Sequence, residues 1–504
     1  MKDKVDVLFI NPGNSRKIYQ DLSVKFSAIE PPVFSGLFAS FIRNKGYSTH
    51  IIDMPAEDHS SAEIATTGLE LSPTLIVLPV YGFQPSASTQ NMTSTGAICQ
   101  EIKNQSPSAK ILLTGTHPAA LPERTLREES IDFVCTREGP FTILGLAQAL
   151  EANDSDFSKV GDLCYWDNNH VRFTDNLPLI KDLDKEMPSI AWDLLQMERY
   201  RAHNWHCFDD IDKRTPYASI HTSIGCPYKC SFCCINAPFS GANYSIGGPS
   251  YRMWRPEQFV REVDYLVENF GIRNIKIPDE MFILNYPHVL GICDLLIERN
   301  YDLNIWAYGR IDTIKPEFLD KIRRAGFRWL GIGIESGSKF VRDGVEKKLR
   351  NEDFVDIIKQ IQAADIYVGC NYIFGLPDDT QETMQETLDL AMEINSENAN
   401  FYSAMAYPGS PLYNMAKEKG LPLPDDPDGP GWIGYAQHAY ETLPLPTDTL
   451  SAVEVLTFRD QAFLKYFTNP SYLEMMRKRF GQKTIDHINE MTGYKKLKRK
   501  ILGD

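Results

Sequence analysis

The sequence predicts an α/β protein built from two successive parallel sheets. Short apolar runs alternate with helical segments in both halves of the chain, and polar or glycine-containing turns follow most of these runs. We expect a doubly wound, Rossmann-like sheet over residues 1–155 and a partial TIM-type barrel of βα units over residues 213–420. Residues 156–212 are predicted to form a linker with a hairpin, and residues 421–504 a mostly helical region.

The composition limits the classes of function. The 504-residue chain is 43% hydrophobic and carries a net charge of −15, which disfavours a broad nucleic-acid-binding surface. No apolar run approaches the ~18 residues of a membrane span. The start of the chain does not resemble a signal peptide. The ten cysteines are too few for a disulfide scaffold and fit a reducing cytoplasm.

The first half reads as a parallel sheet covered by helices. Its strands are expected at residues 5–10, 47–53, 75–80, 110–114 and 131–135, and its helices at residues 34–44, 88–104, from about 123, and 141–152. Ligands of such sheets bind at the carboxyl ends of the strands. No GxGxxG follows the first strand, so a dinucleotide is not expected there.

The second half repeats the alternation. After a hairpin at residues 163–174, strands are expected at residues 218–223, 274–278, 304–308, 329–334, 367–373 and 400–405. Helices are expected at residues 256–269, 315–325 and 353–364. Trp192, between the two halves, is interpreted as a packing residue. The chemistry of barrels collects at the carboxyl ends of their strands.

Three cysteines, Cys226, Cys230 and Cys233, follow the first strand of the second half. A structural zinc site usually needs four ligands, and no second cysteine pair lies nearby. Iron–sulfur clusters are held by cysteine thiolates, and three ligands leave one iron of a [4Fe–4S] cluster open. Buried cysteines that gather by chance are the alternative. Cys234 is interpreted as a packing residue, although it could replace Cys233.

With Phe232 directly before the last cysteine, this loop resembles that of the radical S-adenosylmethionine (SAM) enzymes. The resemblance implies a [4Fe–4S] cluster whose open iron binds SAM, and an electron donor of the flavodoxin or ferredoxin type. Reductive cleavage of SAM would give a 5′-deoxyadenosyl radical. The resemblance also implies SAM contacts from the cysteine loop and the strand ends, namely Phe232, Asp279, Glu280, Arg310, Glu335, Ser336, Ile373 and Phe374. For Asp279 and Arg310, an ordinary salt bridge at the barrel end is an equal alternative.

The run from Gly115 to Glu123, together with Glu138 and Gly139, resembles the cobalamin-binding domain that precedes many radical SAM domains. The resemblance implies that cobalamin is contacted by Asn11, Pro12, Tyr81, Gly82, Thr114, Gly115, Thr116, His117, Glu138 and Gly139. The chain lacks the DxHxxG motif whose histidine ligates cobalt in other cobalamin proteins, so the resemblance implies base-off binding with no histidine ligand from below. His117 is interpreted as a loop residue, with a metal ligand as the alternative. Tyr81 and Phe83 could face the cobalt or pack in the core.

Together, the two resemblances imply a cobalamin-dependent radical SAM methyltransferase that methylates an unactivated carbon of a small molecule or biosynthetic intermediate. A non-methylating cyclase, oxidase or rearrangement enzyme is the first alternative, and a cobalamin-binding sensor is the second. A tRNA methylthiotransferase is disfavoured because only Cys99 and Cys135 precede residue 156. The basic run 495–500 is expected to be a solvated end, with weak attraction to an anionic partner as the alternative.

Overall fold

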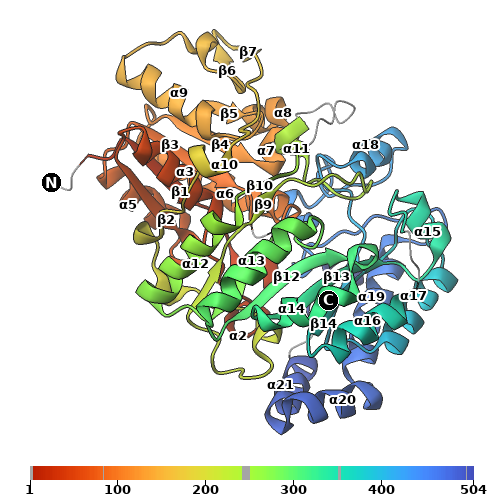
Figure 1. The fold of residues 1–504 in the computed structure, drawn as a ribbon. Coiled ribbons are helices and arrows are strands. Elements are labelled where there is room, and N and C mark those ends of the chain that lie inside the picture. The colour runs from red at the N-terminus through yellow and green to blue at the C-terminus, as the bar shows by residue number, and fades with distance from the viewer. Residues whose placement is uncertain (1–3, 83, 241–249, 350–352, 495–496) are drawn as a thin grey trace.

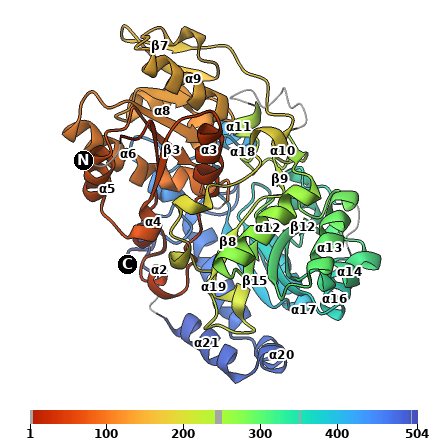
Figure 2. The ribbon, with the colours of Figure 1, turned by 60° about the vertical axis from the view of Figure 1, so that its left-hand side comes forward.

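The computed structural model describes residues 4–82, 84–240, 250–349, 353–494 and 497–504. It contains two large sheets that lie side by side, the first from the N-terminal part of the chain and the second from the part that follows (Figure 1). The C-terminal helices α20 (Pro470–Phe480) and α21 (Gln482–Gly493) lie beyond the second sheet in both ribbon views (Figure 2).

The first sheet confirms the predicted doubly wound architecture. Its seven strands run in the order β2-β1-β3-β4-β5-β6-β7. They are β1 (Val7–Asn11), β2 (Thr49–Asp53), β3 (Leu75–Val80), β4 (Ile111–Gly115), β5 (Phe133–Cys135), β6 (Leu163–Asp167) and β7 (His170–Phe173). The five strands from β1 to β5 are parallel, and β6 and β7 are antiparallel.

Alternation of side chains along β1 explains the two helical layers. Val7 and Phe9 join the apolar cluster that includes Phe41 of α3 (Val33–Asn44) and Leu146 of α9 (Pro140–Glu151). Leu8 and Ile10 join the cluster on the opposite face, against α5 (Ser61–Glu70), α6 (Ala87–Gln105) and α8 (Pro122–Glu128). A strand that is apolar on both faces is buried between two helical layers.

The predicted hairpin is present as β6 and β7, and it extends the first sheet. Phe133 of β5 pairs with Tyr165 of β6, so the hairpin covers the edge of the parallel strands. Covering an edge removes the exposed row of backbone donors and acceptors that favours aggregation. The short helices α1 (Ser15–Tyr19), α2 (Leu22–Lys25), α4 (Met54–Glu57), α7 (Thr116–Ala120) and α10 (Leu183–Glu186) complete this half of the chain.

The second sheet is the predicted partial barrel. Six strands, all paired in parallel, run in the order β15-β14-β13-β12-β11-β8. They are β8 (Tyr217–Ser219), β11 (Asn274–Lys276), β12 (Asn304–Arg310), β13 (Phe327–Glu335), β14 (Tyr367–Phe374) and β15 (Asn398–Ser403). The intervening helices include α12 (Pro256–Phe270), α13 (Tyr286–Arg299), α14 (Leu319–Arg324), α15 (Lys339–Gly344), α16 (Phe354–Ala363) and α17 (Gln381–Ile394).

The strand predicted at residues 218–223 is two short strands. After β8 the chain leaves the barrel sheet, and β9 (Ser223–Ile224) pairs antiparallel with β10 (Arg252–Met253). The cause is a contact that is distant in sequence: the backbone N–H of Thr222 donates to the buried carboxylate of Asp279 (2.8 Å) instead of to a neighbouring strand. This break directs the following cysteine loop across the open end of the barrel.

The C-terminal region ties the two sheets together. It contains α18 (Pro411–Glu418), α19 (Ala452–Phe467), α20 and α21. Between α18 and α19 the chain contacts the first sheet's half, where the Trp432 ring packs on the His117 ring with 4.4 Å between ring centroids. The expectation of a solvated basic tail is wrong at Arg499. This side chain is fully buried, pairs with Asp460 (3.3 Å) and donates to two backbone carbonyls. Lys495 and Lys496 lie outside the described residues.

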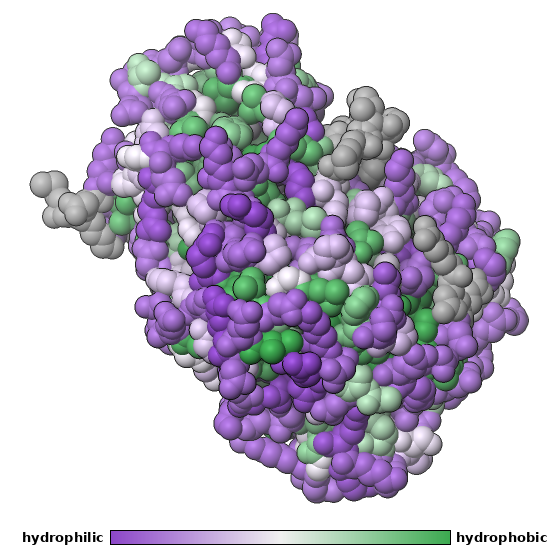
Figure 3. Space-filling model, viewed as in Figure 1, coloured by the Kyte–Doolittle hydropathy of each residue, from purple (hydrophilic) through white to green (hydrophobic). Residues whose placement is uncertain are grey.

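The surface drawn in Figure 3 is mostly hydrophilic, and its hydrophobic residues form small separate groups. Within the described residues, none of the helices combines the length and the apolar character that a bilayer crossing requires.

Candidate cofactor sites

Two large cavities adjoin between the sheets. The first, of about 1340 Å³ with its mouth included, lies at the carboxyl ends of β1 and β3 and extends to β8 and β9. The second, of about 1460 Å³ with its mouth included, lies over the open end of the barrel. Gln84, Pro85, Pro278 and Glu280 line both, so ligands in the two cavities would be neighbours.

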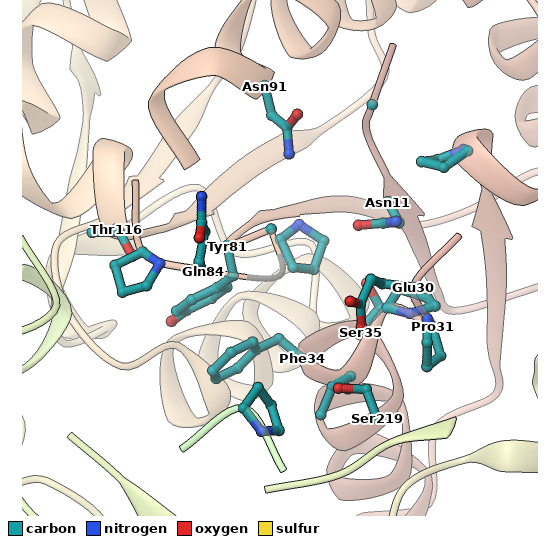
Figure 4. Close-up of a pocket in the computed structure, with 18 of the residues that line it drawn as sticks. Asn11, Glu30, Pro31, Phe34, Ser35, Tyr81, Gln84, Asn91, Thr116 and Ser219 are labelled. Carbon is teal, nitrogen blue, oxygen red and sulfur yellow. The ribbon is translucent and has the colours of Figure 1, made fainter. Parts of the chain in front are cut away.

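The first cavity is built from both halves of the chain. Figure 4 shows Asn11, Glu30 and Pro31 on one side and Tyr81, Gln84 and Thr116 on the other, with Ser219 entering from the barrel. Tyr81 is held by stacking on Phe34, with 3.8 Å between ring centroids. The Asn11 amide donates to Asp53 Oδ1 (2.7 Å), which orients its carbonyl.

Of the residues predicted to contact cobalamin, Asn11, Pro12, Tyr81, Gly82 and Thr116 line this cavity. Thr114, Gly115, His117, Glu138 and Gly139 do not. Gly115 has a structural role, because its φ is 133° and a Cβ on this residue would lie only 2.2 Å from the Val80 carbonyl oxygen. Phe83 lies outside the described residues.

His117 and Glu138 face other partners. The His117 ring packs on Trp432, and burial together with Arg124 lowers the pKa of His117 to about 3. The Glu138 carboxylate pairs with Arg252 of β10 (2.6 Å) and accepts from the backbone N–H of Ile180 (2.9 Å). Glu138 therefore links the first sheet to the segment that follows the cysteine loop.

The cysteine loop is held in place by buried polar contacts. Asp279, at the end of β11, accepts hydrogen bonds from the Thr222 backbone (2.8 Å), the Thr222 hydroxyl (2.6 Å) and the Ser223 hydroxyl (2.7 Å). The carbonyl of Cys226 accepts from the side chains of Asn236 and Ser250, each at 3.2 Å. Asp279 is 1% exposed, and its carboxylate forms these hydrogen bonds with the segment that precedes the loop.

Cys226, Cys230 and Cys233 are half-buried and line the second cavity. Within the described ranges, no three potential ligands converge closely enough for a single metal ion. A cluster presents a separate iron to each thiolate, so thiols spread around one cavity fit it. Burial raises the pKa of Cys230; Lys347 and Arg310 oppose that rise, and Glu335 adds to it.

Six of the residues predicted to contact SAM line the same cavity: Phe232, Asp279, Glu280, Arg310, Glu335 and Ile373. Ser336 and Phe374 do not. The Ser336 hydroxyl lies beside that of Thr387 (3.2 Å), and the Phe374 ring packs against Phe401 and Phe458 on the outer face of β14.

The charged groups around the cysteines are already paired. Arg310 pairs with Asp312 (3.0 Å) and places its guanidinium over the Tyr228 ring (4.1 Å). Glu335 pairs with Lys347 (2.7 Å), and both side chains are buried. Glu335 has φ of 68°, a conformation that is uncommon outside glycine and that concentrates at functional sites.

Glu280 differs from these groups. Its carboxylate makes no hydrogen bond or ion pair to any residue of the described part of the chain, and part of its side chain is exposed to the cavities. Burial and the neighbouring Asp279 raise the pKa of Glu280 to about 7. It is the acidic group at the junction of the two cavities.

Sequence reasoning missed several residues of the second cavity. Lys347, Tyr308, Tyr402, Tyr407 and Gln437 line it. Tyr308 and Tyr402 lie on barrel strands, and the alternation of side chains along those strands is a signal that could have found them. Gln437 comes from the C-terminal region, and nothing in its local sequence marks it.

Comparison with known families agrees with this geometry. The model of the radical SAM superfamily matches residues 220–391, and that of the B12 binding domain matches residues 22–147. Together they match more than half of the chain. The fold and the site thus define a radical SAM enzyme. The chain belongs to the radical SAM enzymes that carry a B12-binding domain, with [4Fe–4S], SAM and cobalamin as their cofactors.

Among curated proteins, an uncharacterized methyltransferase, PH0819 of Pyrococcus horikoshii, is 27% identical over 78% of this chain and 80% of its own. An anaerobic magnesium-protoporphyrin IX monomethyl ester cyclase of Cereibacter sphaeroides is 23% identical over 82% of this chain and 64% of its own.

Among solved structures, the radical SAM methyltransferase TsrM of Kitasatospora setae, with cobalamin and a [4Fe–4S] cluster bound, has a TM-score of 0.67 at 17% identity. That match covers 93% of this chain and 90% of TsrM. The cobalamin-dependent radical enzyme OxsB has a TM-score of 0.66 at 17% identity, covering 97% of this chain and 75% of OxsB. These similarities show the shared fold.

Proposed function

We propose that this enzyme is a cobalamin-dependent radical SAM methyltransferase that methylates an unactivated carbon of a small molecule or biosynthetic intermediate. The observation that carries the proposal is the pair of adjoining cavities, which share Gln84, Pro85, Pro278 and Glu280. A methyl donor in one and a radical source in the other would face the same substrate. The 27% identity to a methyltransferase supports this outcome.

In this proposal, Cys226, Cys230 and Cys233 hold the cluster, and SAM lies beside Phe232, Arg310, Glu335 and Ile373. Cobalamin lies against Asn11, Pro12, Tyr81, Gly82 and Thr116. His117 is not assigned to the cobalt, because its ring is packed on Trp432. Asp279 and Ser336 are proposed to position the chain around the site. The Asp279 carboxylate accepts from the backbone N–H of Thr222, and the Ser336 hydroxyl accepts from the backbone N–H of Ser338.

When bound, the cofactors supply a reducing electron, a 5′-deoxyadenosyl radical and a transferable methyl group. Each turnover would consume two SAM molecules as substrates: one would give up its methyl group and leave as S-adenosylhomocysteine, and the other would be cleaved to methionine and 5′-deoxyadenosine. The electrons for these steps would come from the external electron donor. The residues of the chain would hold these groups in the orientation that the reaction needs and exclude water from the junction of the two cavities. The paired charges Glu335–Lys347 and Arg310–Asp312 keep the cavity wall rigid while ligands enter.

The electron donor is proposed to be a flavodoxin or ferredoxin, and the location the cytoplasm. The support for the location is the set of ten cysteines, all of them free thiols in the structure.

A second outcome is favoured by the similarity to a cyclase. In that case the radical would close a ring or be oxidised on the substrate, without methyl transfer. The two outcomes share every cofactor contact named above, so only the products distinguish them.

The test is an anaerobic assay of the protein loaded with iron, sulfide and cobalamin, and supplied with SAM and a strong reductant. We expect both S-adenosylhomocysteine and 5′-deoxyadenosine, and neither from the Cys230→Ala variant. Deoxyadenosine alone would support the non-methylating outcome. Neither product from a cluster-loaded sample would contradict both and favour a cobalamin-binding sensor.

A further inference from the structure

Three tyrosine hydroxyls that border the two cavities have no acceptor among the described residues. Tyr19 of α1 lines the first cavity, and Tyr308 of β12 and Tyr402 of β15 line the second. Each side chain is half-buried, and none of the three hydroxyls donates a hydrogen bond to any residue that the structure describes. A phenol enclosed by protein without an acceptor loses hydration that only a ligand or water can replace.

The three phenols form one group, although they come from distant segments. Tyr402 lies close enough to Tyr308 and Tyr19 for both to affect its pKa. Burial raises the pKa of all three, so they remain protonated donors near neutral pH.

The position of Tyr308 is built into the barrel. A Cβ at Gly331, on the neighbouring strand β13, would lie 2.6 Å from the Tyr308 ring. The absence of a side chain at residue 331 therefore leaves room for this ring over the sheet. Asn371, on β14, adds an amide that is itself oriented by a hydrogen bond from Asn400 (2.9 Å).

The charges disfavour a polyanionic substrate at this place. Among the described residues that line the two cavities, the only lysine and arginine side chains are Lys347 and Arg310, and each is paired with a carboxylate. The carboxylate at the junction, Glu280, forms no ion pair with a cation of the described chain. A phosphorylated or polycarboxylate substrate would meet this carboxylate without an unpaired cation to compensate it.

We propose that Tyr19, Tyr308 and Tyr402 form the substrate subsite, and that the substrate is a neutral, oxygen-rich molecule whose hydroxyl or carbonyl groups accept from these phenols. Glu280 accepts from a hydroxyl or N–H donor of the same molecule. The inference rests on the proposed function, because it places the substrate between the two cofactors. A bare hydrocarbon would leave all three phenols unsatisfied, at a cost that disfavours it.

The test measures binding without turnover. The oxidised protein, loaded with cluster, cobalamin and SAM, is screened by saturation-transfer NMR against three probe sets. The first contains neutral molecules: methyl glucoside, N-acetylglucosamine and the cyclic dipeptide of glycine. The second contains the 6-phosphates of glucose and N-acetylglucosamine, and the third contains cyclohexane and cyclohexene. We expect binding from the first set alone.

Variants locate the binding. In Tyr308→Phe and Tyr402→Phe we expect the dissociation constant of a neutral probe to rise about twofold to tenfold each, the effect of losing one neutral hydrogen bond. The matched control is Tyr372→Phe, because Tyr372 lies on the outer face of β14 and stacks on Phe401. Cobalamin and iron content of each variant show that the cavities are still formed.

Three results would overturn the inference: preferred binding of the phosphorylated or hydrocarbon set, no binding of any neutral probe, or neutral binding unchanged in both phenylalanine variants. The outcome is separable from that of the proposed function, since no chemistry occurs in the binding assay. Neutral probes bound by a protein that forms neither SAM product would refute the methyltransferase and leave the subsite standing.

Discussion

At the scale of single residues, Cys233 and Cys234 have different environments. Cys233 is half-buried at the second cavity, whereas Cys234 is 2% exposed. We expect Cys230→Ala and Cys233→Ala to reduce the iron and sulfide bound after reconstitution to background, and Cys234→Ala to retain them. Chemical iron and sulfide analysis measures this. Loss of the cluster in Cys234→Ala with retention in Cys233→Ala would reverse the assignment.

Asp279 is expected to hold the strand before the cysteine loop. Its replacement by Ala removes the acceptor of three hydrogen bonds, and bonds to charged groups contribute about 1.5–3 kcal/mol each. We expect residues 217–226 to exchange their amide hydrogens at least tenfold faster in Asp279→Ala, measured by mass spectrometry. Unchanged exchange there would mean that the carboxylate does not anchor this segment.

Asp53 gives a pH dependence with a defined sign. Burial raises the pKa of Asp53 to about 7, although hydrogen bonds from Asn11 and Tyr200 oppose the rise. A carboxyl with a raised pKa in the folded state stabilises the fold fully below its unfolded pKa. That contribution is lost as the pH increases through the folded pKa. The wild type should therefore lose thermal stability relative to Asp53→Asn between about pH 4 and pH 7. Melting temperatures that change equally with pH in the wild type and in Asp53→Asn over that range would contradict this prediction.

The positions of single side chains could be predicted only in part, because they depend on neighbouring residues in the fold. The resemblance implies SAM contacts for both Ile373 and Phe374, but adjacent residues of a strand point to opposite faces. Ile373 lines the cavity and Phe374 packs against α19. Asp279 and Arg310 line the second cavity, and their internal partners, Thr222 and Asp312, could not be predicted from the sequence because these contacts depend on the folded loop.

At the scale of elements, β10 links the cysteine loop to the first sheet. Arg252 of β10 pairs with Glu138, and both side chains are 10% exposed. Removing one partner of a buried pair costs about 3–5 kcal/mol, because the other charge is left uncompensated. We expect Arg252→Met to lower cluster retention and speed amide exchange in β10, and Arg252→Met with Glu138→Leu to recover part of both.

The double variant is the control for a general loss of folded structure. If the single and double variants lose the cluster equally, then the ion pair does not position β10. If neither loses it, the link between the two halves is carried by other contacts, such as Arg137, whose guanidinium donates to the Phe239 carbonyl (2.7 Å).

Most elements could be predicted, because strand and helix periodicities are local properties of the sequence. β3 (Leu75–Val80) and α3 (Val33–Asn44) lie within a residue of their predicted bounds. The short helix α7 (Thr116–Ala120) was missed, since it follows β4 directly and has no apolar period of its own. The separation of β8 from β9 was missed because its cause, Asp279, is 57 residues away from Thr222.

In the whole molecule, the two sheets could be predicted from the sequence, but the way in which they pack against each other could not. The cysteine motif and the loop around Thr116 indicate two cofactors, whereas the junction depends on the approach of Gln84 and Pro85 to Pro278 and Glu280. The C-terminal region contributes through Asp425, which accepts from Tyr413 (2.7 Å) and pairs with Arg124 of the first domain. Such long-range contacts have no local signature.

Electron paramagnetic resonance can show whether the two cofactor sites adjoin. The protein is loaded with cobalamin and cluster, both centres are reduced to their paramagnetic states, and the magnetic interaction between them is measured. We predict a dipolar interaction on both signals, and in Cys230→Ala an isolated cobalt signal of unchanged cobalamin content. Two fully loaded centres without any magnetic interaction would show that the two cofactor sites do not adjoin.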